Sequence, residues 1–280
     1  MKISLLLLTL LALLLAVLFV LRLLDKRAER MEWTRLASLQ TKDPACYKPE
    51  MVAGLPEPAQ RFLNFAIVPG TPLLTVAELE MGGRFSLGSR DAANYRPMQA
   101  RQILAAPQGF VWHLHLLGLI PVSGSDSGRW TRFRLLGLLP VARMGGDPDH
   151  ARSAFGRYIA ESVFWTPAAV LPGPNVVWES VDSDTARVTI SHGALAQTVS
   201  LKIDTDGRPR EVSFLRWSNA NTDKTYRLQP FGGLLSDFRD VQGYRLPFRV
   251  EAGNLFGSDD YFPFYKAQVT AIRFPPNPSV

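Results

Sequence analysis

The chain has 280 residues, a formal net charge of +6 at pH 7, 46% hydrophobic residues and one cysteine. A single cysteine excludes an internal disulfide and thiolate-rich zinc sites, so the stability of the fold must come from packing. The basic residues are dispersed and match no nucleic-acid-binding motif, so we expect no nucleic-acid partner.

An almost unbroken apolar run begins the chain, from Ile3 to Leu21, and Leu23 and Leu24 resume it after Arg22. A run of about 20 apolar residues is long enough for a helix to cross the hydrocarbon core of a bilayer. It exceeds the apolar core of a cleavable signal, which spans about 7–15 residues, and no small-x-small cleavage triplet follows it. We therefore expect residues 1–24 to form one retained transmembrane anchor.

Positive charges are concentrated just after this anchor. Positive residues near the end of a membrane helix usually stay in the cytoplasm, so the count favours a cytoplasmic domain and the side of the membrane stays open. The basic residues on the exit side are Arg22, Lys26, Arg27, Arg30 and Arg35, against Lys2 on the other side.

The segment 25–54 is expected to be a juxtamembrane helix, over 29–40, followed by a linker broken by two prolines and a glycine. A second helix is expected to begin at Pro56, whose fixed φ suits a first helical turn. Its apolar residues have the i, i+3, i+4, i+7 spacing of a buried stripe. They are Ala59, Phe62, Leu63 and Ala66, and Pro69-Gly70 ends the helix.

From Thr75 onward, short segments alternate between apolar and polar residues and are bounded by turn residues, a pattern that predicts strands. Short connections, including hairpin turns at Asp206-Gly207 and Gln242-Gly243, favour antiparallel pairing because parallel strands need longer crossovers. The predicted strands are 76–87, 98–105, 110–116, 129–136, 176–181, 186–191, 198–204, 211–217, 225–230, 236–241, 248–251 and 265–274.

One amphipathic helix interrupts the strands. Asp147-Pro148 is typical of an N-cap and first turn. The apolar face that follows must be buried, and the sheet is its available partner. This face contains Ala151, Ala154, Phe155, Tyr158, Ile159 and Ser162. The expected fold class is α+β, predominantly antiparallel β, with residues 55–280 as one β-rich globular domain.

Two segments nearly repeat each other, Leu-Leu-Gly-Leu-Ile-Pro-Val at 116–122 and Leu-Leu-Gly-Leu-Leu-Pro-Val at 135–141. Apolar backbone with Gly and Pro breaks suits bends and edges, so the pair could form the mouth of a hydrophobic groove or a surface that dips into a bilayer. The commoner arrangement is two core strands that end in turns.

Several spaced motifs together resemble an uncharacterised bacterial family with a domain of unknown function. The motifs are Leu-Pro-Glu-Pro-Ala-Gln-Arg from Leu55, the 135–141 repeat, Ala160-Glu161 before Trp165-Thr166-Pro167, and Phe238-Arg239 before Arg245-Leu246-Pro247. The resemblance runs from about Leu55 to the C terminus and implies no catalytic role. A more distant similarity, in architecture alone, is to LolA-type lipoprotein carriers. It implies a curved sheet or half-barrel around an apolar cavity, covered by one or two helices. From this similarity together with the apolar run at residues 1–24, we expect a protein of the bacterial envelope, with a single pass through the cytoplasmic (inner) membrane.

Catalytic and metal sites have little support. His113 and His115 are expected on one strand face, where a metal would need His150, His192 or a carboxylate as a further ligand. Two ordinary histidines on a polar face are the preferred interpretation. Neither Gly-x-Ser-x-Gly nor a phosphate-binding Gly-x-x-x-x-Gly-Lys occurs. We expect no catalytic residue, no metal and no cofactor, and an enzyme is the less favoured class.

The aromatic content suits a cavity for an acyl chain or another apolar ligand. The favoured hypothesis is a membrane-tethered domain that binds or carries a lipid-like ligand; the alternative is a structural domain, solid inside, that binds a membrane-protein partner. Glu161 lies four residues after Arg157, so the two side chains can form an ion pair on the helix surface. If both faces of the helix are covered, this pair is instead buried or faces a ligand headgroup. The expected ligand-binding residues are Trp112, Leu119, Trp130, Leu138, Tyr158, Glu161 and Trp165.

Overall fold

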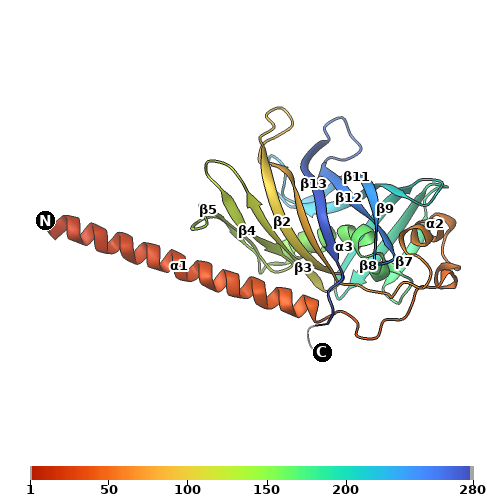
Figure 1. The fold of residues 1–280 in the computed structure, drawn as a ribbon. Coiled ribbons are helices and arrows are strands. Elements are labelled where there is room, and N and C mark those ends of the chain that lie inside the picture. The colour runs from red at the N-terminus through yellow and green to blue at the C-terminus, as the bar shows by residue number, and fades with distance from the viewer. Residues whose placement is uncertain (1, 278–280) are drawn as a thin grey trace.

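The fold is one curved antiparallel sheet with a helix on each of its faces (Figure 1), in a computed structural model that describes residues 2–277. The strands in this range are β1 (Ala77–Ser86), β2 (Tyr95–Ala105), β3 (Gly109–Leu116), β4 (Val122–Ser127), β5 (Thr131–Leu135), β6 (Leu139–Met144), β7 (Val176–Ser180), β8 (Thr185–His192), β9 (Leu195–Ile203), β10 (Pro209–Ser218), β11 (Arg227–Val241), β12 (Tyr244–Asn254) and β13 (Phe262–Arg273). Their order is β6-β5-β4-β3-β2-β1-β13-β12-β11-β10-β9-β8-β7. Within the described residues β6 and β7 are unpaired edges, so the sheet curves without closing.

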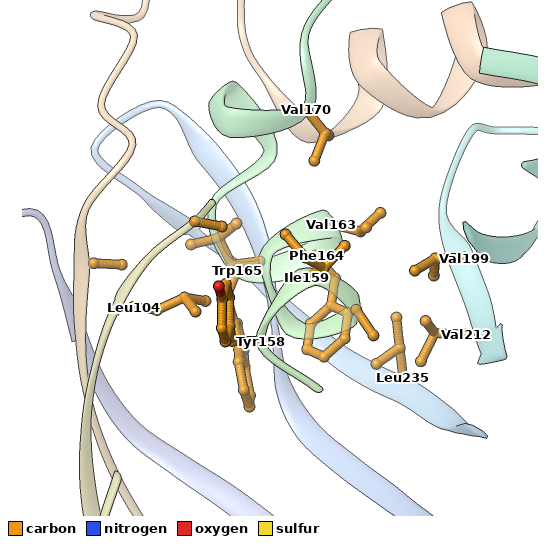
Figure 2. Close-up of a cluster of buried hydrophobic side chains, with 14 of the residues drawn as sticks. Leu104, Tyr158, Ile159, Val163, Phe164, Trp165, Val170, Val199, Val212 and Leu235 are labelled. Atoms are coloured by element: carbon orange, nitrogen blue, oxygen red, sulfur yellow. The ribbon is translucent and has the colours of Figure 1, made fainter. Parts of the chain in front are cut away.

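Helix α3 (Pro148–Trp165) packs inside the curve against β9, β10 and β12, and also against β2 and β3 on the opposite side. Figure 2 shows its apolar side chains, among them Ile159 and Val163, meeting Val199, Val212 and Leu235 of the surrounding strands. The helix starts where predicted, because the Asp147 carboxylate accepts a hydrogen bond from the backbone N–H of His150 at 2.8 Å. Both faces of α3 are therefore covered, and the fold agrees with the predicted class.

Helix α1 (Lys2–Ala37) runs without a break through the expected boundary between residues 24 and 25. Its first part is exposed, whereas its last turns lie on the outer face of β2 and β3. There Leu36 packs with Ile103 and Val111, and the indole N–H of Trp33 donates to Glu78 at 2.7 Å. Because side chains alternate along a strand, Val111 faces α1 while its neighbour Trp112 faces α3.

The remaining helical segments lie at one end of the sheet. Helix α2 (Glu57–Ala66) follows the predicted pattern and buries its apolar stripe against β7, β8 and β12. Two short 3₁₀ helices, η1 (Pro49–Val52) and η2 (Pro167–Val170), precede α2 and follow α3.

Most predicted strands are present. Two observed strands were not predicted, and two predicted strands are joined into one. β4 was missed because its sequence is polar and it buries only Ser125 and Ser127. β6 was missed because Pro140 interrupts its pattern, and an edge strand tolerates a proline that a central strand would not. The two strands predicted over 225–230 and 236–241 are one, β11, which continues through Gly232 and Gly233.

Glycine permits this continuity and the tight turn that follows. A Cβ on Gly233 would lie 2.0 Å from the carbonyl oxygen of Glu251 on β12, so only glycine allows these strands to approach. Gln242 and Gly243 both have positive φ, as the predicted hairpin turn between β11 and β12 requires.

Candidate ligand-binding site

A cavity of about 620 Å³ lies between the concave face of the sheet and α3. Its walls are apolar and largely aromatic. On one side they are Phe85, Leu87, Trp112, Leu114, Leu116, Val122, Phe133, Leu135, Val141 and Ala142; on the other they are Val212, Phe214, Phe231, Gly232, Val250, Ala252, Phe264 and Tyr265. Helix α3 closes the base with Ala160, Phe164 and Trp165, beside the charged residues Arg157 and Glu161.

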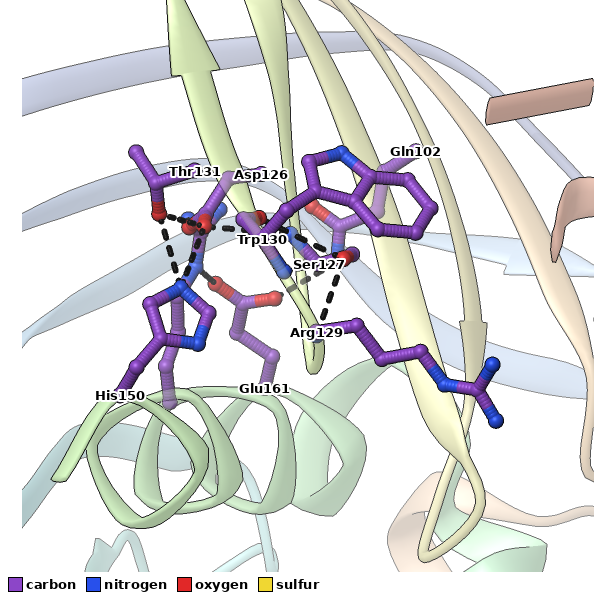
Figure 3. Close-up of polar contacts among 9 residues, drawn as sticks. Gln102, Asp126, Ser127, Arg129, Trp130, Thr131, His150 and Glu161 are labelled. Atoms are coloured by element: carbon purple, nitrogen blue, oxygen red, sulfur yellow. Dashed lines mark hydrogen bonds and ion pairs between the residues drawn. The ribbon is translucent and has the colours of Figure 1, made fainter. Parts of the chain in front are cut away.

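Arg157 is the centre of a polar cluster at this base. Its guanidinium donates to Glu161 at 2.8 Å and to Asp126 of β4 at 2.8 Å, and Gln102 donates to the other oxygen of Glu161 at 2.6 Å. Figure 3 shows Asp126, Gln102 and Glu161 converging above α3. Burial opposes the charge of Arg157, but the two carboxylates outweigh it and raise the pKa of the guanidinium. Of the two arrangements considered for the Arg157–Glu161 pair, the covered one is present.

Arg216 of β10 lines the same cavity, but not all of its hydrogen-bond donors have partners among the described residues. Its guanidinium carbon lies 5.1 Å from the centre of the Phe231 ring, and its Nε is buried with no hydrogen-bond partner among the described residues. Burial and the nearby charge of Arg157 lower the pKa of Arg216 to about 10. Trp112 likewise has a buried indole N–H without a partner in the described part of the chain. The cavity therefore contains buried hydrogen-bond donors that have no acceptor among the described residues.

Three of the predicted ligand-binding residues, Trp112, Glu161 and Trp165, line the cavity. Two others are buried outside it: the indole N–H of Trp130 donates to Ser125 at 3.0 Å, and the Tyr158 hydroxyl donates to the Pro107 carbonyl at 3.1 Å.

The last two predicted residues lie in turns of the repeated segments. Leu119 is in the β3–β4 turn and is 98% exposed, and Leu138 is half-buried in the β5–β6 turn. The strand ends on either side of these turns, Leu116 and Leu135 among them, face the cavity. Both arrangements weighed for the repeats are thus combined, with strand ends in the wall and apolar residues exposed at the turns.

The far wall was missed by sequence reasoning. Phe214 and Arg216 have the i, i+2 spacing of one strand face, and an arginine on an otherwise apolar face is a signal that the sequence does contain. Phe231 and Tyr265 come from β11 and β13, which become neighbours of the predicted residues only when the sheet curves.

The histidines are dispersed. His113 and His115 share the outer face as expected, where His113 Nδ1 lies 3.0 Å from a carboxylate oxygen of Glu29. His150 is next to Thr131 at 3.1 Å, and His192 ends β8. No group of three His, Cys, Asp or Glu side chains within residues 2–277 is placed to hold a metal ion.

Comparisons with known proteins give a family match and a fold similarity. The model of a family described as "Family of unknown function (DUF6544)" matches residues 45–267. No curated protein matches the chain. A LolA superfamily protein from Nitrosomonas europaea is similar at a TM-score of 0.39 and 11% identity, over 78% of this chain and 91% of that one.

A second solved structure is similar at the same low identity. It is a candidate outer membrane lipoprotein-sorting protein domain from Vibrio parahaemolyticus, with a TM-score of 0.35 and 11% identity over 81% of this chain and 91% of that one. The expected resemblance to an uncharacterised family, with distant LolA-type similarity, is confirmed by these matches.

Proposed function

Because the chain belongs to DUF6544, a family of unknown function, we propose a function from its own cavity: it is a membrane-tethered domain that binds or carries a lipid-like ligand. One observation carries the proposal, the apolar cavity of about 620 Å³ with a few polar groups at its base. Sites for small apolar ligands commonly have volumes of roughly 300–1,000 Å³ and a mainly hydrophobic lining.

The polar base narrows the chemistry of the ligand to an amphiphile. Arg157 is already occupied by two carboxylates, whereas Arg216 and Trp112 have donor groups to spare. A buried donor without a partner is unfavourable, so a ligand oxygen that accepts these hydrogen bonds gains affinity. Carboxylate, phosphate ester and carbonyl oxygens all fit, with an acyl chain along the aromatic walls.

The first helix supports the tether. α1 is long and apolar enough to cross a membrane, judged by its length and composition. In this proposal residues 1–24 are the single-pass anchor in the cytoplasmic (inner) membrane, 25–54 the juxtamembrane segment and 55–280 the ligand-binding domain. The membrane bilayer is then both the site of attachment and the source of the ligand.

Native mass spectrometry of the full chain, released in mild detergent from lipid-containing membranes, tests the proposal. Filling the cavity with Ala160→Phe should remove a bound species of lipid mass, since Ala160 lies at the base. The matched control Ala196→Phe, at an exposed position of β9, should retain it and allows for lipid held by α1. Equal lipid occupancy in both variants, or a wild-type chain that refuses added lipid, would overturn the proposal.

The alternative, a structural domain with a solid interior, requires that no cavity exists, and the cavity on the concave face argues against it. A metal-dependent enzyme would need ligands beyond His113 and His115. Their outer-face position separates them from the aromatic cavity, so nothing in the geometry favours this third function.

A further inference from the structure

Two hairpin turns expose apolar side chains at one edge of the sheet. We call them the apolar turns: residues 117–121, between β3 and β4, and residues 136–138, between β5 and β6. Leu119 is 98% exposed and Leu136 is 61% exposed. Because β3, β4, β5 and β6 are neighbours and antiparallel, both turns lie at the same end of the strands. An apolar surface concentrated at one edge is a mark of an interaction site.

The apolar turns stand next to α1 where its apolar run ends. A Cβ on Gly137 would lie 3.3 Å from a guanidinium nitrogen of Arg22, the first charged residue after that run. A groove between α1 and the sheet is lined by Arg22 and Lys26. Pro121 of the first apolar turn and Leu136 and Gly137 of the second also line it. Figure 1 shows β4 and β5 extending beside α1 toward its N-terminal part.

This position has a meaning for a helix that crosses a membrane. At 1.5 Å per residue, the run from Ile3 to Leu21 is about 30 Å long, which matches the hydrocarbon core of a bilayer. Arg22 then lies at the boundary between hydrocarbon and headgroups. Since both apolar turns are level with Arg22, they reach the same boundary.

Polar contacts fix α1 to the sheet and hold the apolar turns next to Arg22. Asp25 pairs with Arg132 and Arg143, and Glu29 pairs with Arg101 at 3.0 Å. The β3–β4 turn is itself held in shape, since Arg96 donates to the carbonyl of Ile120 at 2.6 Å. The turns and the anchor therefore behave as one unit.

We propose that the two apolar turns insert into the interface of the membrane that α1 crosses, and that the cavity thereby opens toward the bilayer. The occupant of this surface is the lipid interface itself, with headgroup phosphates beside Arg22 and Lys26. The cavity reaches the same edge, because Leu116 and Leu135, which directly precede the turns, line its wall. Insertion of the turns rests on the membrane tether of the proposed function, and ligand entry by this route rests on its lipid-like ligand.

Depth-dependent quenching in proteoliposomes of the full chain tests the insertion. Cys46 is the only cysteine, so a Cys46→Ser background allows single labels at Leu119→Cys and Leu136→Cys. An environment-sensitive fluorophore at either turn should be quenched several-fold more by phospholipids spin-labelled near the glycerol than a label at Val181→Cys. Val181 is 47% exposed and lies at the opposite end of the strands. Quenching at both turns no stronger than at Val181 would overturn the inference.

A second measurement separates this inference from the proposed function. In the cavity-filled Ala160→Phe chain, quenching at Leu119→Cys should persist, since the turns do not depend on a ligand. Strong quenching together with no lipid species in the wild-type mass spectrum would retain the insertion and reject the ligand. In the converse test, Leu119→Asp with Leu136→Asp should slow the uptake of lipid from vesicles. Unchanged uptake in that variant would reject entry by this edge.

Discussion

Asp25 of α1 and Arg143 of β6 are joined by two hydrogen bonds, of 2.8 and 3.1 Å. Arg134 of β5 donates to the same carboxylate, and Arg132 pairs with it at 2.9 Å. One nearly buried carboxylate therefore offsets three guanidinium groups on the outer face of the sheet. Asp25 is thus part of the folded domain as well as of the long apolar helix α1.

Asp25→Asn should lower the free energy of unfolding by about 3 kcal/mol, because three arginines would then face one another without a carboxylate. Urea unfolding of the full chain in detergent, followed by tryptophan fluorescence, measures this change. The control Asp260→Asn removes an exposed pair with Arg90 and should stay within about 0.5 kcal/mol of wild type. Equal effects of the two variants would contradict a structural role for the Asp25 cluster.

Arg157→Leu should destabilise the domain by about 3–5 kcal/mol, because Asp126 and Glu161 would lose the guanidinium that they share at the base of the cavity. Neutralising both acids in the triple variant, with Asp126→Asn and Glu161→Gln added, should recover part of this loss. Chemical denaturation of the three chains measures the coupling. A triple variant no more stable than Arg157→Leu would contradict a charge-pairing role for Arg157.

Arg216→Met should weaken the binding of an amphiphile such as oleate by about tenfold, the usual loss when a hydrogen bond to a charged group is removed. Binding of a hydrocarbon of the same chain length should change little, because the apolar walls are intact. Displacement of a fluorescent fatty acid measures both affinities. Arg210→Met, an exposed arginine of the same strand paired with Asp204, is the matched control. Equal loss for oleate and the hydrocarbon would remove Arg216 as the contact for the ligand head.

Gly233→Ala should cost about 1–3 kcal/mol of stability, because its Cβ would meet the Glu251 carbonyl and force β11 away from β12. At Gly173, which is exposed and where a Cβ would make only an ordinary contact at 3.9 Å, alanine should be neutral or slightly stabilising. Thermal unfolding of the two variants compares them. A stable Gly233→Ala chain would mean that the two strands tolerate a wider spacing than the structure has.

Local chemistry explains which elements were predictable. Asp147 followed by proline marks the start of α3, and Gln242-Gly243 marks a hairpin, because capping and positive φ depend on a few adjacent residues. β4 and β6 have no such local signal. They form strands because β3 and β5 offer them hydrogen-bonding edges, which is a tertiary cause.

The apolar first helix, the antiparallel β-rich domain and the amphipathic α3 could be predicted from the sequence, since periodicity and turn chemistry act over short distances. The cavity forms only when distant segments fold together. Trp112, Arg157 and Arg216 come from β3, α3 and β10, and the curvature of the sheet brings them to one apolar space. The position of Pro121 and Leu136 beside Arg22 likewise depends on how α1 crosses the outer face, because these residues are distant in the chain.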